Sequence, residues 1–285
     1  METSATAQRL SSRFVAGHTL EDAIAVCVRT RAEGILTTLD YLGENVKSLS
    51  EAAACRDMYL RTLSAMKVAG IEPNVSVKLT QLGVDLSQRA CEENAAALVQ
   101  AAASQAGFIR FDMESSQYTD RTLAIVKRLH GQYGTCGTVI QAYLRRSPAD
   151  VQSLENEKIR VRLCKGAYLE KPDVAFAVKT DVDQNYLDLA RSLLTSGEYP
   201  AIATHDERII NEVERYSAQN GIGPDRFEFQ MLYGIRRDLQ RRLVKDGHRL
   251  RLYVPFGEAW YPYFMRRLAE RPANLLFFLR HALRS

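Results

Sequence analysis

The stretch RLRLYVPFGEAWYPYFMRR (residues 249–267) contains a strand, a break and the start of a helix. Apolar and polar residues alternate over 249–255, which predicts a β-strand. Pro255 and Gly257 interrupt the alternation, and a helix-forming run begins at Glu258. A strand followed by a helix is the unit of parallel sheets, so the fold depends on how often this unit recurs.

The same unit recurs along the chain, and we predict eight strands, each followed by a helix. The predicted strands cover residues 35–43, 74–80, 108–114, 137–144, 158–166, 201–206, 226–232 and 249–255. The helices between them cover 50–69, 87–106, 118–132, 148–157, 174–196, 207–220 and 236–246. Eight such units in 285 residues favour a closed (β/α)8 barrel. No GxGxxG turn follows a strand, which weighs against an open, doubly wound sheet.

A further helix is expected before the first strand. Thr19 and Asp22 form a capping-box pattern that starts a helix over about 20–33. We therefore expect an N-terminal helical extension at 1–33, followed by the barrel domain at 34–285.

Composition narrows the classes of function. The net charge is +4, and basic residues are interspersed with acidic ones, which does not suggest a nucleic-acid-binding protein. An acidic small substrate or loose contact with an anionic membrane surface is compatible with this charge. Five cysteines without CxxC spacing indicate reduced thiols in the cytoplasm, and no cluster has metal-ligand spacing. The sequence shows no apolar run of transmembrane length and no secretory signal.

Polar residues at the predicted strand ends indicate a site, because catalytic groups of such barrels gather at the C-terminal ends of the strands. The convergent residues are Lys78, Asp112, Gln141, Arg162, Lys165, His205, Gln230 and Tyr253. Isolated buried charge is expensive, so eight convergent polar groups predict a polar ligand.

Several of these residues also have ordinary structural explanations. Lys78 or Asp112 could form an ion pair at the rim, and His205 could be a structural histidine. Asp112 and Glu114 point to opposite faces of their strand, so we do not expect them to share a proton. Lys165 precedes two small residues that would let a ligand approach the backbone, although a simple turn explains them equally well.

A pair of arginines lies on the last predicted helix. Tyr263 is three and four residues before Arg266 and Arg267, so it shares a face or edge with each. Two adjacent guanidiniums suit a small carboxylate ligand. Basic residues that complement the dipole of the helix end are the alternative explanation.

Eight short segments carry a resemblance: seven lie near the ends of the second to eighth predicted strands, and one lies on the last helix. They are SVKL (76–79), FDME (111–114), IQAYL (140–144), VRLCKGAY (161–168), ATHD (203–206), FEFQMLYG (227–234), YVPFG (253–257) and YFMRRL (263–268). In this order they resemble the proline dehydrogenase family, in its monofunctional bacterial branch, from about residue 14 to the end. Tyr233 is one departure, because many relatives carry histidine there.

The resemblance implies a distorted barrel with FAD bound non-covalently at its mouth and the last helix lying over that mouth. It implies oxidation of L-proline to Δ1-pyrroline-5-carboxylate by hydride transfer to the flavin N5, the first step of proline catabolism. Electrons would leave through a quinone at the inner face of the cell membrane. Peripheral membrane contact and a homo-oligomer are left open.

The resemblance also implies roles for residues of this chain. Arg266, Arg267 and Lys78 would bind the substrate carboxylate, and Tyr253 and Tyr263 would pack around the ring. The catalytic candidates are Asp112, which would orient this cluster, and Arg162, which would sit near the reactive edge of the flavin. The cofactor-binding candidates are Met113, Gln141, Arg162, Lys165, Gly166, Ala167, Thr204, His205 and Gln230.

Other functions remain in competition. A hydroxyproline dehydrogenase would share the same chemistry. A Schiff-base lyase would use Lys78 or Lys165 as its nucleophile and would need no flavin. A binding module with basic pairs facing nucleic acid is the non-enzymatic alternative.

Overall fold

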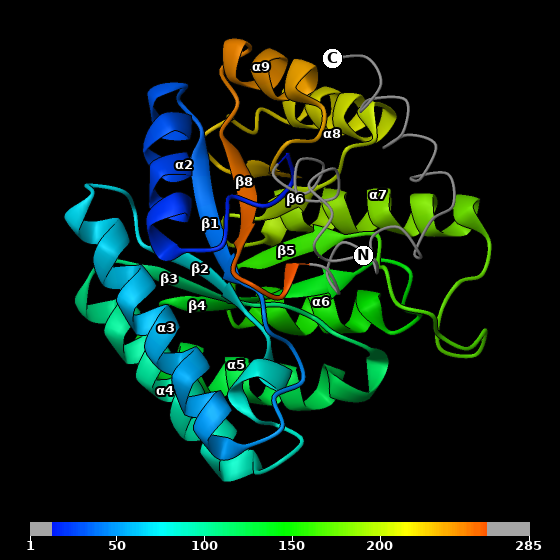
Figure 1. Cartoon of the computed structure of the whole chain (residues 1–285). Helices are drawn as coiled ribbons and strands as arrows, with labels where there is room; N and C mark the ends of the chain where they lie inside the picture. Colours follow the sequence, from blue (N-terminus) through cyan, green and yellow to red (C-terminus); the bar gives the residue numbers. More distant parts are fainter. Residues whose placement is uncertain (1–12, 261–285) are drawn as a thin grey trace.

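The structure, a computed structural model, describes residues 13–260. Within this range eight strands form a closed parallel barrel in chain order (Figure 1), which confirms the predicted (β/α)8 fold. The strands are β1 (Leu36–Tyr41), β2 (Asn74–Val77), β3 (Phe108–Phe111), β4 (Cys136–Gln141), β5 (Val161–Cys164), β6 (Ala201–Ala203), β7 (Glu228–Leu232) and β8 (Leu250–Phe256). The first strand pairs with the last, from Leu36 opposite Arg251 to Tyr41 opposite Phe256.

Helices connect the strands and surround the barrel (Figure 1). They are α3 (Leu49–Val68), α4 (Gln88–Ser104), α5 (Thr119–Tyr133), α6 (Ser147–Asn156), α7 (Lys179–Ser196), α8 (Glu207–Gln219) and α9 (Arg237–Lys245). Short 3-10 helices η1 (Leu79–Leu82) and η2 (Ser116–Tyr118) follow β2 and β3. The helix expected over the barrel mouth lies outside the described residues.

Helix α2 (Leu20–Ala32) precedes β1 and begins where the sequence predicts. The backbone N–H of Asp22 donates to Thr19 Oγ1 at 3.2 Å, and the Thr19 N–H donates to Asp22 Oδ2 at 3.1 Å. The predicted capping box is therefore present, and it satisfies two donors that the first turn of a helix would otherwise leave unpaired.

The loop after β5 is longer than the sequence predicts. Helix α7 begins at Lys179 and not at residue 174. The preceding residues instead pair with the chain after β4, where the Phe176 N–H donates to the Tyr143 carbonyl at 2.7 Å. Pro172 lies just before this segment and cannot donate a backbone hydrogen bond. The hydrogen bond from Phe176 to Tyr143 connects this loop to the end of β4, beside the mouth of the barrel.

Neighbouring strand residues alternate between an apolar layer and a polar interior. Residues facing the helices pack into one core, and examples are Leu39, Val75, Phe111, Leu163 and Phe229. The residues next to them in sequence bear polar side chains that bond one another, and they are Asp40, Ser76, Asp112, Arg162 and Gln230. All ten are buried. Hydrogen bonding offsets the cost of burying so many polar groups inside the barrel.

Candidate active site at the barrel mouth

Lys78 lies at the centre of a charged cluster at the C-terminal ends of the strands. Its Nζ donates to Asp40 Oδ1 at 3.1 Å, to the Tyr253 hydroxyl oxygen at 3.2 Å and to Asp112 Oδ2 at 3.4 Å. Glu44 Oε1 is 3.5 Å away. The lysine comes directly after β2, and its backbone N–H donates to Gln81 Oε1 in η1, which fixes the exit of the chain from the strand.

Asp112 joins this lysine to Arg162. The carboxylate accepts from Arg162 Nη1 at 2.8 Å and from the Tyr253 hydroxyl at 2.8 Å. Arg162 Nη2 donates to Ser76 Oγ at 2.9 Å, and its Nε donates to Gln230 Oε1. The guanidinium also lies 5.3 Å from the centre of the Tyr253 ring. Every nitrogen of Arg162 is therefore held by a partner. We call Asp40, Glu44, Lys78, Asp112, Arg162 and Tyr253 the mouth cluster.

Opposing effects set the pKa values in the mouth cluster. Burial would raise the pKa of Asp112, but the positive charges of Lys78 and Arg162 outweigh it and hold that pKa below its ordinary value. Burial would lower the pKa of Lys78, but neighbouring carboxylates, Asp40 first, raise it well above the ordinary value. A lysine held as an ammonium by ion pairs is a poor nucleophile, which weighs against the Schiff-base lyase that uses Lys78.

Asp40 and Glu44 belong to the site although the sequence analysis did not include them. Asp40 is fully buried at the end of β1, and its Oδ2 has no hydrogen-bond partner among residues 13–260. Burial raises the pKa of Asp40 to about 6, and Lys78 only partly counters this. The sequence signal was available, because Asp40 lies near the end of the first strand and Asp112 directly follows the third.

The mouth cluster has an excess of negative charge. Among the described residues it contains two cations, Lys78 and Arg162, and three carboxylates, Asp40, Glu44 and Asp112. A small carboxylate would be a fourth anion in a buried place, and binding it would require further positive charge. Tyr263, Arg266 and Arg267 lie outside the described residues, so the structure does not place the predicted clamp.

Other predicted site residues lie around the ends of β4, β5 and β6, where they contact residues outside the mouth cluster. Gln141 Nε2 donates to the Glu114 carbonyl at 2.8 Å. Lys165 Nζ pairs with Asp183 Oδ1 at 2.6 Å and with Asp206 Oδ2 at 2.9 Å. The structure therefore divides the eight convergent residues into a central network and this second group.

Thr204 and His205 also belong to this second group. Thr204 Oγ1 accepts from the Asp206 N–H at 3.0 Å. His205 Nε2 accepts from the Leu232 N–H at 2.9 Å, which places the proton of a neutral ring on Nδ1. Met113 is buried beyond the end of β3. The hydrogen bond to Leu232 is the kind of contact expected of a structural histidine, which was the alternative explanation for His205.

Glu114 is separated from Asp112, as the alternation of their strand predicts. The Glu114 carboxylate accepts from Thr80 Oγ1 at 2.6 Å and from the Thr80 N–H at 3.2 Å. Burial raises the pKa of Glu114 to about 7. Glu114 and Asp112 therefore have different hydrogen-bond partners.

A glycine and a tyrosine near Lys165 fit a bound polar cofactor. Gly166 has φ +111°, and a Cβ there would lie 2.0 Å from the Tyr143 ring, so only glycine is accommodated. The buried Tyr143 hydroxyl has no hydrogen-bond partner within residues 13–260. Together with the ammonium of Lys165 and the small Ala167, these groups would supply donors and close backbone approach if a phosphate-bearing cofactor bound here.

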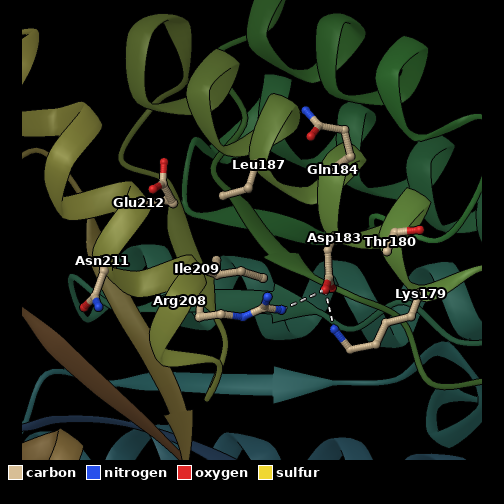
Figure 2. A pocket seen from close by; sticks show the side chains of 9 residues that line it. All are labelled: Lys179, Thr180, Asp183, Gln184, Leu187, Arg208, Ile209, Asn211 and Glu212. Atoms are coloured by element: carbon tan, nitrogen blue, oxygen red, sulfur yellow. Dashed lines mark hydrogen bonds and ion pairs between the residues drawn. The ribbon is translucent and has the colours of Figure 1, made fainter.

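A groove of about 550 Å³ lies between α7 and α8 (Figure 2). Its wall includes Asp183, which pairs with Lys179 and, at 3.5 Å, with Arg208. The same Asp183 holds Lys165, so the groove borders the second group from outside the barrel. In the part of the chain that the structure describes, no group of acidic, histidine and cysteine residues could hold a metal ion, and no helix is long and apolar enough to cross a bilayer.

A closed barrel with a buried charge network at the C-terminal ends of its strands defines a barrel enzyme that acts on a small polar molecule. The sequence model of one family, described as "Proline dehydrogenase", matches residues 23–280. The chain belongs to the proline dehydrogenase family, which is flavin-dependent and oxidises proline.

Similar proteins agree with this assignment. "Proline dehydrogenase" of Deinococcus radiodurans is 43% identical over 280 residues, which are 96% of this chain and 90% of the relative. "Proline dehydrogenase 1" of Bacillus subtilis is 40% identical over 95% of this chain and 90% of the relative. A crystal structure of proline utilization A from Bdellovibrio bacteriovorus, inactivated by N-propargylglycine, has TM-score 0.86 and 28% identity. It matches 92% of this chain, which spans only 32% of that larger protein.

Proposed function

We propose that this chain oxidises L-proline to Δ1-pyrroline-5-carboxylate with FAD as its cofactor. The observation that carries the proposal is the network of Lys78, Asp112, Arg162 and Tyr253 at the barrel mouth, in a chain of the proline dehydrogenase family. The reaction removes a hydride from the carbon next to the ring nitrogen, and a protonated amine opposes that step. The site must therefore anchor the carboxylate and favour the neutral amine.

We propose that Arg266 and Arg267 supply the positive charge that the mouth cluster lacks. Lys78 is surrounded by carboxylates, so it would contact the substrate carboxylate as one part of a larger cationic group. Three cations around the carboxylate would disfavour a fourth positive charge on the bound amine. Tyr253 and Tyr263 would pack around the ring, while Asp112 would keep Lys78 and Arg162 in place.

FAD would be held by the second group of residues together with Met113, Arg162 and Gln230. The proposed contacts are Met113, Gln141, Arg162, Lys165, Gly166, Ala167, Thr204, His205 and Gln230. When bound, FAD supplies the hydride acceptor of the reaction. The fixed positive charge of Arg162, held at all three nitrogens, would favour the electron-rich reduced form of the cofactor.

A quinone is the proposed final electron acceptor, met by peripheral contact with the inner face of the cell membrane. Proline and hydroxyproline differ by one hydroxyl, and no described contact favours hydroxyproline. A ratio of kcat/KM values for the two substrates that favoured hydroxyproline would replace the proposed substrate with that alternative.

The test compares the two arginines of the predicted clamp with a third arginine of the same chain. Arg266→Met or Arg267→Met should raise KM for proline at least about tenfold, because a charged hydrogen bond to the substrate is lost, while FAD remains bound. Arg241→Met in the exposed part of α9 removes the same charge away from the mouth and should leave KM unchanged. The purified protein should be yellow and should lose its visible absorbance when L-proline is added without oxygen. A colourless protein, or unchanged KM in both mouth variants, would contradict the proposal.

A further inference from the structure

A second charged pair lies inside the barrel below the mouth cluster. Glu228 at the start of β7 accepts from Arg251 Nε through both carboxylate oxygens, at 2.9 and 3.1 Å. Both side chains are buried. Arg251 Nη1 also donates to the Thr37 carbonyl at 2.9 Å, and Nη2 is 3.3 Å from Glu72. We call Glu228 and Arg251 the lower pair.

Gln230 connects the lower pair to Arg162. Its Nε2 donates to Glu228 Oε1, and its Oε1 accepts from Arg162 Nε. An amide can be reversed within nearly the same space, so its orientation depends on its neighbours. An ionised carboxylate only accepts hydrogen bonds, and it therefore forces the NH₂ group of Gln230 toward itself.

The charge of Glu228 is secured by its surroundings. Burial would raise the pKa of this carboxyl group, but the adjacent Arg251 outweighs burial and holds the pKa below its ordinary value. Two strand positions separate Glu228 from Gln230, so both side chains point into the barrel from β7. The lower pair therefore presents a permanent acceptor directly below the amide.

We propose that Glu228 is a positioning residue that fixes the amide of Gln230 and, through it, the guanidinium of Arg162. The remaining anchors of Arg162 are Ser76, on β2, and Asp112, which directly follows β3. If the Gln230 amide reversed, its NH₂ would face the Arg162 N–H, donor against donor, and one of three anchors would be lost. The role at the cofactor rests on the proposed function, whereas the contact between Glu228, Gln230 and Arg162 does not.

A double-mutant cycle separates this role from simple stabilisation. Glu228→Gln should lower the rate of flavin reduction by proline about tenfold, the effect of one hydrogen bond to a charged group, with little change in proline affinity. In a Gln230→Met background the same substitution should change that rate less than about twofold, because the relay is already broken. Equal losses in both backgrounds would overturn the proposal.

Hydrogen exchange at the Arg162 Nε–H gives a readout independent of turnover. The signal is assigned in the ¹⁵N-arginine-labelled holoenzyme by its loss in Arg162→Lys. Exchange should accelerate at least about tenfold in Glu228→Gln and stay unchanged in Glu72→Gln, which alters only the outer partner of Arg251.

If Glu228→Gln does not fold, the double variant Glu228→Gln with Arg251→Met removes the uncompensated cation and should show the same acceleration. Unchanged exchange would overturn the proposal even in an active enzyme, and an inactive wild type would overturn the proposed function alone.

Discussion

The mouth cluster and the lower pair are both buried and charged, but they differ in how completely their charges are paired. In the lower pair one carboxylate meets one guanidinium through two contacts, and each stabilises the charge of the other. In the mouth cluster three carboxylates share two cations, and one oxygen of Asp40 has no hydrogen-bond partner within the described chain.

This difference distinguishes a structural ion pair from a site prepared for a ligand. A charge that is already paired does not require a further charged ligand, so the lower pair can serve as structural support for its neighbours. An unbalanced buried cluster is costly in isolation, and it becomes favourable only when further charges arrive. The four predictions that follow test this comparison at single residues, in order of decreasing effect on stability.

The largest effect is expected for Asp112→Ala. The substitution leaves Lys78 and Arg162 without their shared carboxylate, so two buried cations repel each other. We expect a loss of roughly 5 kcal/mol in the free energy of unfolding, the upper end for breaking a buried ion pair, together with loss of proline oxidation. Urea denaturation and steady-state kinetics measure the two effects. A loss below about 1 kcal/mol would show that the mouth cluster does not depend on this carboxylate.

The lower pair should behave as a replaceable unit. Arg251→Met alone leaves the buried Glu228 without its ion-pair partner and should cost about 3 kcal/mol of unfolding free energy. The double variant Arg251→Met with Glu228→Leu removes both charges and should recover most of that loss. Flavin reduction should nevertheless stay slow in the double variant, because Gln230 has lost its fixed acceptor. A double variant as unstable as the single one would contradict the comparison.

Asp40→Asn should change how stability depends on pH. Because burial raises the pKa of folded Asp40 to about 6, above the value of about 3.9 in an unfolded chain, folding takes up a proton. Its contribution to stability is complete below the unfolded pKa and is lost as the pH rises through about 6. Between pH 4.5 and pH 7, the free energy of unfolding of Asp40→Asn should therefore rise by about 2 kcal/mol relative to that of the wild type.

Urea denaturation of both proteins at these two pH values measures the difference. Glu114 titrates in both proteins, so its contribution cancels to first order. A constant difference between the two proteins across this range would mean that Asp40 does not titrate there.

The smallest effect is expected for Glu72→Gln. Glu72 is 3.3 Å from Arg251, but its side chain is 45% exposed, so solvent screens the interaction. We expect a loss below about 1 kcal/mol in unfolding free energy and unchanged turnover. A loss as large as that of Arg251→Met would show that the lower pair extends to the surface and is not the closed unit described above.

Most of the fold could be predicted because each strand has its own local pattern. Short apolar runs bounded by turn residues predicted all the strands of the described barrel, and Thr19 predicted the start of α2. The start of α7 could not be predicted, because residues 174–178 have a helix-compatible composition. Their backbone groups are instead taken by the chain after β4, a contact distant in sequence.

The site could be predicted where a polar residue ends a strand. This rule gave Lys78, Asp112 and Arg162, which the structure brings into one network, and it would also have given Asp40. It could not show that Lys165 turns toward α7, because Asp183 lies on a helix many residues later. It could not give the pairing of Glu228 with Arg251 either, since that depends on the register between two strands.

The pairing of β1 with β8 has a consequence for synthesis of the protein. β1 leaves the ribosome first, yet the strand that completes its second edge is the last of the barrel to be translated. The nascent chain must therefore carry an open strand edge for most of its production, a state prone to unwanted association.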